Sequence, residues 1–288
     1  MNNLNYELKQ LCHRCREGSA NTQRDRIKIL TLCANDLKEL GFKHMKLTSL
    51  KPKHVEALLN KWNKEELSQG TLKNRMSHLR WWVQKINRAG IIPKDNAALG
   101  IEQRCYVTSE NKAKTLDAEK LKSITDSHIK MSLRLQAAFG LRRQESIKFN
   151  PNYADQGDHI QLKGSWTKGG KSRMVPIRTT EQRALLNEIH AFAGKGSLIP
   201  AHKSYKEQLR VYEGLCKKAG LTKMHGLRHQ YAQERYEALT GWKSPKAGGP
   251  KQNTLRPEQK IIDEEARLTI SRELGHERLE VVKVYIGG

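Results

Sequence analysis

Six side chains in the second half of this 288-residue chain have the types and order of a site for phosphoryl transfer. Breaking a phosphodiester needs an attacking oxygen, cationic groups that stabilise charge on the phosphate, and a proton donor for the departing oxygen. Two arginines, a lysine, two histidines and a tyrosine can divide these tasks among them without a metal ion. The six residues are Arg142, Lys168, His225, Arg228, His276 and Tyr285.

Tyr285 lies nine positions after His276 and is the candidate nucleophile. A tyrosine hydroxyl is mostly protonated at neutral pH, so nearby cations or a base must favour its phenolate form. His225 could accept that proton or donate to the phosphate, and His276, beside Gly275, could hydrogen-bond the same phosphate. His229 is expected to point elsewhere and to have a structural role.

Arg142 and Arg228 are the candidate phosphate ligands, because a guanidinium is permanently charged and makes two parallel hydrogen bonds to phosphate oxygens. Glu145 follows Arg142 by three positions, which places both side chains on one face if the segment is helical. We therefore expect Glu145 to be the acidic companion of the arginine pair. Arg143 is expected at the surface, in contact with the DNA backbone.

A glycine-flanked basic turn, residues 167–171, provides the candidate general acid. An ammonium group at the tip of a hairpin can reach the leaving oxygen, and neighbouring arginines would lower its pKa. Lys168 is the preferred proton donor, with Lys171 and Arg173 as close rivals. Lys171 and Arg173 are otherwise expected to contact the DNA backbone.

The formal net charge of +23 favours a polyanionic partner, and double-stranded DNA suits the predicted chemistry. The excess is +9 in residues 1–110 and +14 in residues 111–288, so both halves could contact a phosphate backbone. A clamp around a duplex would require such a distribution. A basic but solvated surface is the alternative.

Apolar periodicity predicts a small helical bundle in the first hundred residues. Apolar side chains recur at steps of three and four in residues 21–40, after Pro52 and after Thr71. The neighbouring side chains of Trp81 and Trp82 point in different directions from a helix. One of them is therefore expected in the core and the other in a seam between domains.

A polar stretch, residues 105–116, is typical of a linker between a domain of residues 1–104 and a domain of residues 117–288. Asp117 is the expected N-cap of the helix that follows. Alternating polarity over residues 158–177 predicts a β-hairpin. Further helices are expected at about 129–138, 181–193, 204–219 and 225–239.

Residues 240–258 contain glycines, three prolines and several lysines but few apolar anchors. We expect an irregular basic loop that stays mobile unless DNA orders it. No stretch reaches the roughly 18 apolar residues of a membrane span, and the amino terminus has no apolar signal core. The expected location is the cytoplasm, in association with the nucleoid, and no membrane partner is expected.

Five cysteines, an odd number, favour reduced thiols over a disulfide framework. Cys12 and Cys15 have the spacing of half a zinc knuckle, but no second pair of ligands follows at a suitable distance. Neither a metal ion nor another cofactor is expected.

The motifs resemble those of the tyrosine recombinases, also called the phage integrase family. The matching segments are an arginine box at 139–145, a β-hairpin lysine segment at 167–176, a His-x-x-Arg box at 225–229, and Leu-Gly-His at 274–276 followed by Tyr285. The resemblance implies catalytic roles for the six residues named above, with Glu145 beside Arg142. The segment between His225 and His276 is longer than is usual in the family.

The resemblance implies a mainly α fold, with an N-terminal helical core-binding (SAM-like) domain and a mixed α/β catalytic domain that contains a small antiparallel sheet. It also implies a site-specific recombinase that cuts and rejoins DNA through a 3′-phosphotyrosyl intermediate, for integration or excision of a mobile element. A homo-oligomer on DNA, expected to be a tetrameric synapse, and accessory DNA-bending proteins would be its partners.

Two alternative functions fit parts of the same pattern. A type IB topoisomerase-like enzyme would use the same residues to relax one duplex without bringing two together. A non-catalytic DNA clamp would need the basic charge but would have no use for Tyr285 at its position after His276.

Overall fold

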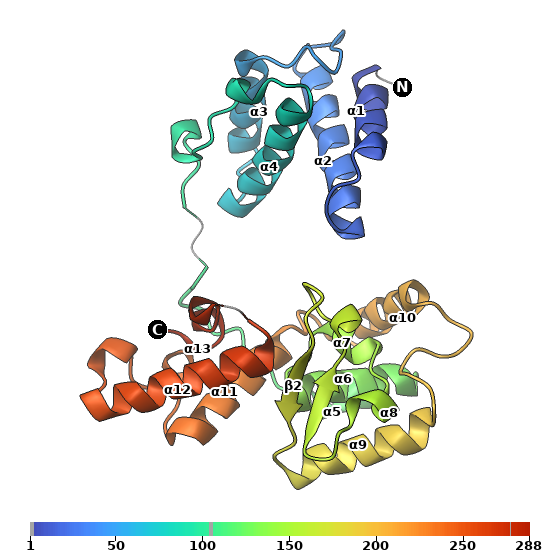
Figure 1. Ribbon diagram of the computed structural model, residues 1–288, viewed down its shortest axis with the longest axis vertical. Coiled ribbons are helices and arrows are strands. Elements are labelled where there is room, and N and C mark those ends of the chain that lie inside the picture. The colour runs from blue at the N-terminus through green and yellow to red at the C-terminus, as the bar shows by residue number, and fades with distance from the viewer. Residues whose placement is uncertain (1–2, 104–105, 277) are drawn as a thin grey trace. The chain divides into compact units, whose positions relative to one another are not determined.

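The computed structural model describes residues 3–103, 106–276 and 278–288. The chain divides into two compact units, Met1–Cys105 and Tyr106–Gly288 (Figure 1). Among the described residues, no helix is both long and apolar enough to cross a membrane.

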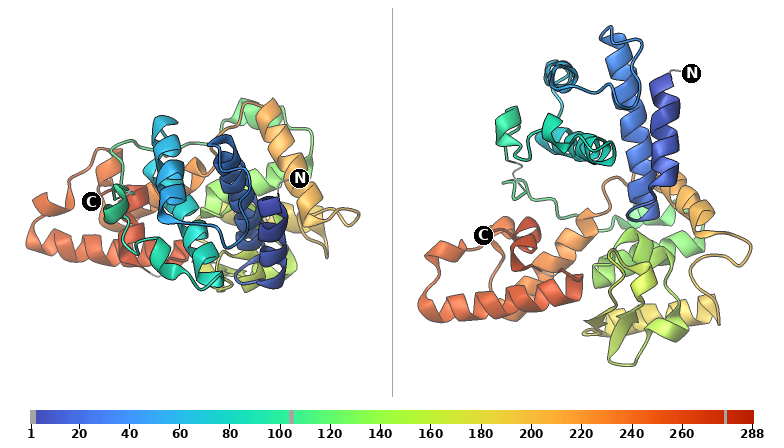
Figure 2. Two further views of the ribbon diagram at one scale, coloured as in Figure 1. Left: turned by 90° about the horizontal axis from the view of Figure 1, so that it is seen from above. Right: turned by 45° about the horizontal axis from the view of Figure 1, so that its top comes forward.

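The first unit is a helical bundle. Its elements are α1 (Asn3–Arg14), α2 (Ala20–Glu39), α3 (Pro52–Lys64), α4 (Gln69–Lys85) and the 3-10 turns η1 (Ala89–Ile91) and η2 (Ala97–Leu99). The hydroxyls of Ser19 and Ser68 cap α2 and α4 by accepting backbone N–H groups, and Pro52 occupies the first turn of α3. Figure 2 shows α1 and α2 side by side. The predicted small helical bundle is confirmed.

Both adjacent tryptophans of α4 are buried, so the prediction that only one lies in the core is wrong. Trp82 donates from its indole nitrogen to the carbonyl of Leu47, at 3.0 Å. Trp81 donates to Glu17 at 3.0 Å, and the guanidinium of Arg26 lies 4.1 Å from its ring centroid. Because α4 packs against both α2 and η1, two of its faces are covered within the same unit.

The second unit is mainly α-helical and contains one small sheet. Its elements are α5 (Ala118–Lys122), α6 (Ser127–Phe139), α7 (Arg143–Ile147), α8 (Pro151–Ala154), β1 (His159–Leu162), η3 (Gly164–Trp166), β2 (Arg173–Pro176), α9 (Thr180–Ala193), α10 (Tyr205–Lys218), α11 (Gly226–Thr240), η4 (Pro245–Ala247), η5 (Gln252–Thr254), α12 (Pro257–Leu274), η6 (Leu279–Val281) and α13 (Lys283–Ile286). The carboxylate of Asp117 caps α5 by accepting the Lys120 N–H at 3.0 Å, as predicted.

The predicted hairpin is confirmed: β1 and β2 pair antiparallel, with Leu162 opposite Arg173 and Ile160 opposite Val175. The inward-facing Ile160, Leu162 and Val175 are fully buried. Strand β2 also packs against α12, so the sheet directs its Arg173 end toward that helix.

Helix α11 lies beside α12 in the second unit and packs against α6, α12 and α13 (Figure 1). Its buried residues lie all around its axis instead of on one stripe. Several of them are polar or charged, including Arg228, His229 and Gln233. Buried polar groups cost free energy unless they are paired, so a helix of this kind indicates a functional interior.

The segment that joins the units along the chain packs onto the second unit. The backbone N–H of Lys114 donates to the carbonyl of Gly226 at 3.0 Å, and the side chains of Asn111 and Gln233 exchange hydrogen bonds. Residues 106–116 therefore group with Tyr106–Gly288. Residues 104 and 105, where the first domain was predicted to end and the linker to begin, lie outside the described residues.

The predicted loop 240–258 is ordered in its first half by contacts within the second unit. Ser244 is fully buried, and its carbonyl accepts the backbone N–H groups of Ala247 and Gly249 at 2.8 and 2.9 Å. The segment between α11 and α12 thus spans Gly241 to Arg256 and contains two 3-10 turns, η4 and η5. The structure differs from the expected irregular loop because backbone hydrogen bonds hold the segment and its two large apolar side chains, Trp242 and Leu255, pack against the protein.

Candidate active site

Helix α11 presents three of the polar side chains of the site from its first turn. His225 lies at the N-cap of α11, and Arg228 and His229 follow three and four positions later. Residues three and four apart share a helix face, which turns all three toward the same region. The turn after α12 adds His276, and the short helix α13 adds Tyr285.

Tyr285 lies at the centre of these side chains. Its hydroxyl is 3.5 Å from Nε2 of His225, and the guanidinium carbon of Arg228 is 5.7 Å from its ring centroid. The rings of His229 and His276 lie with their centroids 4.6 and 5.4 Å from that of Tyr285. The structure joins four of the six predicted catalytic residues in one cluster, in which Tyr285 (5% exposed) and Arg228 (1%) are buried, His276 is partly exposed and His225 is exposed.

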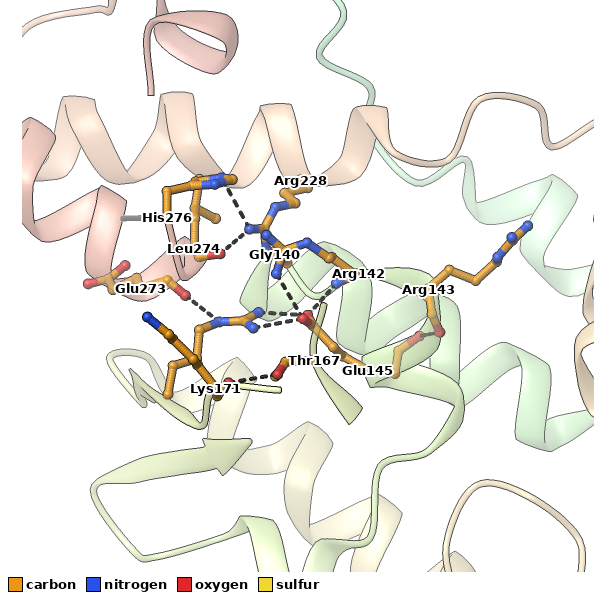
Figure 3. Close-up of polar contacts among 12 residues, drawn as sticks. Gly140, Arg142, Arg143, Glu145, Thr167, Lys171, Arg228, Glu273, Leu274 and His276 are labelled. Atoms are coloured by element: carbon orange, nitrogen blue, oxygen red, sulfur yellow. Dashed lines mark hydrogen bonds and ion pairs between the residues drawn. The ribbon is translucent and has the colours of Figure 1, made fainter. Parts of the chain in front are cut away.

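Arg228 connects this cluster to two other elements. One terminal nitrogen donates to the carbonyl of Gly140 at 2.6 Å, and the other donates to the carbonyl of Leu274 and lies 3.5 Å from Nε2 of His276 (Figure 3). Burial lowers the pKa of Arg228 to about 10, which still leaves it protonated at neutral pH. Its Nε has no hydrogen-bond partner among the described residues. An anion that reached this donor would satisfy it.

Glu145 anchors two further arginines. Arg173 donates from both terminal nitrogens to the two carboxylate oxygens, at 2.7 and 2.6 Å, and Arg142 donates through its side chain at 2.9 Å and its backbone N–H at 2.7 Å (Figure 3). Glu145 is 0% exposed. Burial alone would raise the pKa of this carboxyl, but Arg173, Arg228 and Arg142 outweigh burial and lower it to about 2. The predicted pairing of Glu145 with Arg142 is present.

The histidines of the cluster are held neutral. Burial, then the positive charge of Arg228, lowers the pKa of His276 to about 3. Burial and the neighbouring His225 lower the pKa of His229 to about 4, and burial with Arg228 also lowers the pKa of His225. A neutral imidazole offers one N–H donor and one acceptor, so these rings can donate to a phosphate or accept a proton.

Lys168 lies exposed in the turn between β1 and β2. The Thr167 hydroxyl shapes this connection by donating to the carbonyls of Gly164 and Lys171, at 2.9 and 2.6 Å. In the described chain, the hydrogen bonds and ring contacts that join Tyr285, His225, Arg228 and His276 do not include Lys168. Lys171 is also exposed.

Two residues predicted to contact DNA make protein contacts in the structure. Arg173 is buried, and its Nε donates to the carbonyl of Glu273 at 2.9 Å while its other nitrogens bind Glu145. We therefore assign it a positioning role in place of the predicted DNA contact. Arg143 forms an exposed ion pair with Glu213 at 2.9 Å.

Two members of the site were not identified from the sequence. His229 was expected to point away, yet its ring packs on Tyr285 because α11 is buried on that side as well. Glu273 accepts hydrogen bonds from Tyr231 at 2.7 Å and from Arg235 at 2.9 Å, and so holds the end of α12. The four-residue spacing of His225 and His229 could have indicated that both lie on one helix face. Nothing local in the sequence indicates the pairing of Glu273.

Two glycines are required by the close packing around the arginines. Gly140 has φ +61°, and a β-carbon there would lie 2.5 Å from the ring of Tyr231. Gly275 has φ +66°, and a β-carbon there would lie 2.8 Å from Arg173. These positions allow the carbonyls of Gly140 and Leu274 to approach Arg228. In the described part of the chain, no three His, Cys, Asp or Glu residues gather as metal ligands.

Comparison with protein families gives two matches. Residues 1–92 match the family described as phage integrase, N-terminal, and residues 104–234 match the family described as integrase. Of the predicted catalytic residues, four lie inside the second range, and His276 and Tyr285 follow it. No curated protein sequence matches the chain.

Solved structures with a similar fold include three integrase or recombinase complexes. The Tn1549 transposon integrase in complex with circular intermediate DNA is 13% identical, with a TM-score of 0.59, and the match covers 98% of this chain and 95% of that chain. A lambda integrase tetramer bound to a Holliday junction is 15% identical, with a TM-score of 0.60 and coverage of 99% and 77%. The XerH site-specific recombinase bound to difH is 16% identical, with a TM-score of 0.55 and coverage of 98% and 80%.

These similarities agree with the two-unit fold and with the confirmed hairpin. The two family matches together span most of the chain, from residue 1 to residue 234. The chain therefore belongs to the phage integrase family of tyrosine recombinases, enzymes that cleave and rejoin DNA.

Proposed function

We propose that this chain is a site-specific recombinase that breaks DNA by attack of Tyr285 and holds the broken strand as a 3′-phosphotyrosyl intermediate. The observation that carries the proposal is the cluster in which the Tyr285 hydroxyl lies 3.5 Å from His225 and its ring 5.7 Å from the Arg228 guanidinium. A nucleophile, a base and a cation are thus within reach of one phosphate group.

In the cleavage step, the Tyr285 oxygen forms a bond to phosphorus and the bond from phosphorus to the 5′ oxygen breaks. His225, which burial and Arg228 keep neutral, accepts the tyrosine proton at Nε2. Lys168 donates a proton to the departing 5′ oxygen, which leaves as a hydroxyl. Rejoining is the reverse reaction, in which the 5′ hydroxyl of a partner strand attacks the phosphotyrosyl bond and releases Tyr285. Each step exchanges one phosphoester bond for another, so the reaction needs no nucleoside triphosphate.

The arginines stabilise the charge that develops on the phosphate. Arg228 keeps one unpaired N–H among the described residues, and a non-bridging phosphate oxygen would satisfy it. Arg142 has a partly exposed side chain that is bound to Glu145 by one terminal nitrogen, which leaves further donors for the same phosphate. His276, 3.5 Å from Arg228, donates to a third position.

We infer the biological role from the charge and the similar structures. The excess of +23 suits contacts with double-stranded DNA. One similar structure is a transposon integrase, and another is a tetramer on a Holliday junction. These similarities support a role in integration or excision of a mobile element, in a homo-oligomeric, tetrameric synapse. We also propose that accessory DNA-bending proteins assist the synapse and that the protein is associated with the nucleoid.

A nicked suicide duplex tests the chemistry. Cleavage near the nick releases a short fragment, so the covalent complex accumulates and is seen as a protease-sensitive shifted band on a denaturing gel. The proposal predicts that the released strand carries a free 5′ hydroxyl, which a kinase labels without prior phosphatase treatment. The 3′ end should be blocked by protein. A blocked 5′ end, or tight binding without any covalent band, would contradict the proposal.

The assignment of the general acid gives a prediction that separates Lys168 from Lys171. Lys168→Met is expected to slow formation of the covalent complex by about 10²–10⁴-fold, the usual contribution of a positioned acid. A substrate with sulfur at the bridging 5′ position has a leaving group that needs no proton, and it should restore most of the rate to this variant.

Lys171→Met is the matched control, because it removes the same charge from the same exposed turn. If Lys171 contacts the DNA backbone, this variant should bind the duplex more weakly, and the sulfur-bridged substrate should not restore its cleavage rate. Recovery by Lys171→Met and not by Lys168→Met would exchange the two roles.

A further inference from the structure

Helix α13, which carries Tyr285, is only one turn long. A helix of four residues is not stable by itself, because nucleation costs more than one turn of hydrogen bonds returns. Its last carbonyls have no partners within the helix and must find donors elsewhere. Three side chains from other elements supply these donors. The carbonyls that receive them are those of Val284 and Tyr285 in the helix and that of Gly287, the residue directly after it.

Lys246 is the donor to the first of these carbonyls. Its Nζ lies 3.0 Å from the carbonyl oxygen of Val284 and 3.3 Å from that of Glu110. Lys246 belongs to η4, in the segment Gly241–Arg256 that lengthens the chain between α11 and α12. A cation at a helix C-terminus satisfies the free carbonyls and interacts favourably with the helix dipole.

Gln233 is the donor to the second carbonyl. Its Nε2 lies 3.0 Å from the Tyr285 carbonyl oxygen and 2.8 Å from Oδ1 of Asn111, and Nδ2 of Asn111 donates back to Oε1 of Gln233 at 3.2 Å. Gln233 is buried in α11. The backbone carbonyl of Tyr285 is therefore hydrogen-bonded to Gln233, and Gln233 is in turn hydrogen-bonded to Asn111, in the segment that precedes α5.

The third carbonyl and the packing around it complete the contact surface. Arg267 of α12, fixed by Asp263, donates to the Gly287 carbonyl at 2.8 Å. A β-carbon on Gly287 would lie 2.9 Å from the β-carbon of Pro245. The turn η4 therefore rests directly against the end of α13.

We propose that Lys246 and Gln233 are positioning residues that hold α13, and with it the Tyr285 hydroxyl, in place against residues 110–111. The inference rests on the proposed function, because it assigns the two side chains a purpose only if Tyr285 is the nucleophile. It also gives the segment Gly241–Arg256 a role, because this segment carries the lysine that donates to the Val284 carbonyl of α13. Neither side chain contacts the phosphate in this account.

The test measures the rate of covalent complex formation on the suicide duplex at saturating protein. Lys246→Met keeps the aliphatic stem and removes the donor, and we expect the rate to fall about 10–100-fold, as for a nucleophile displaced by about 1 Å. The dissociation constant for the uncleaved duplex should stay within about twofold. Lys246→Arg restores a donor and should recover most of the parent rate.

Lys251→Met is the matched control, since it removes an exposed lysine from the same segment and should leave the rate unchanged. If the parent forms no covalent complex, the proposed function fails. If the parent is active and Lys246→Met cleaves as fast as Lys251→Met, only the positioning role is overturned. A sulfur-bridged 5′ position should give Lys246→Met no recovery, because its defect lies in the nucleophile and not in the leaving group.

Hydrogen exchange gives a second readout that needs no substrate. The backbone N–H of Gly287 donates to the Lys283 carbonyl, and its exchange reports opening of α13. Peptides that begin at Val284 should exchange faster in Lys246→Met and in Gln233→Met than in Lys251→Met, with other peptides unchanged. Equal exchange in all three variants would overturn the inference even if one substitution reduced activity by unfolding the protein.

Discussion

Tyr285→Phe is expected to abolish the covalent complex with the suicide duplex, with a loss of at least about 10⁴-fold, because removal of a catalytic nucleophile leaves no alternative attacking atom. The substitution removes one oxygen and keeps the ring that packs against His229. Folding and affinity for the uncleaved duplex should therefore stay close to those of the parent. Gel shifts and denaturing gels on the same reactions measure both quantities.

Tyr153→Phe is the control for this prediction. Tyr153 is exposed in the same unit, and its ring contacts with Trp166 do not involve its hydroxyl. This variant should cleave at the parent rate. Residual covalent complex in Tyr285→Phe above about one part in a thousand of the parent amount would mean that another side chain attacks the phosphate.

Glu145→Gln is expected to destabilise the second unit by about 3–5 kcal/mol, the usual cost of removing one partner from a buried ion pair. The amide can no longer balance the charges of Arg173 and Arg142, and its NH₂ group would face their donors. For a unit of this size the loss corresponds to about 6–20 °C in the melting temperature. Calorimetry on the full chain measures the shift.

Glu213→Gln makes the same chemical change in an exposed ion pair. Glu213 binds Arg143 at 2.9 Å, as Glu145 binds Arg142, but its side chain is 53% exposed. Surface pairs of this kind contribute about 0–1 kcal/mol. Equal melting temperatures for the two variants would show that burial of Glu145 under the arginines does not stabilise the fold.

The ion pairs of Glu145 should also make the stability of the fold depend on pH. The pKa of Glu145 is about 2 in the folded chain and has an ordinary value of 4.5, so the folded state favours the ionised carboxylate. The contribution, about 3 kcal/mol, is therefore complete above pH 4.5 and is lost as the pH falls toward 2. Glu145→Gln should remove this part of the acid sensitivity. A variant with the same acid profile as the parent would contradict the assignment.

Apolar periodicity and capping residues were enough to predict most of the helices. Helix α2, the hairpin and the Asp117 cap follow from local patterns and were found where expected. Helix α1 was not predicted, although Leu4, Leu8 and Leu11 show helical spacing. Helix α12 is harder to recognise, because its buried face contains charged residues, such as Asp263 and Arg267, that neutralise each other.

The types of the site residues could be predicted, but not the pairs that position them. The order of the motifs indicated Tyr285, Arg228 and His225, which the structure places together. The pairing of Glu145 with Arg173 joins residues 28 positions apart, and no local rule connects them. The contact between Lys246 and α13 depends in the same way on tertiary folding and not on spacing in the sequence.

Identification of the residue bonded to DNA tests the central claim most directly. The trapped complex from the suicide duplex is digested with nuclease and trypsin, and the peptide that carries a nucleotide is sequenced by mass spectrometry. Cleavage after Lys283 separates Tyr285 from the other tyrosines of the chain. The account predicts a nucleotide on Tyr285 in the peptide that begins at Val284. A nucleotide on any other residue would contradict it.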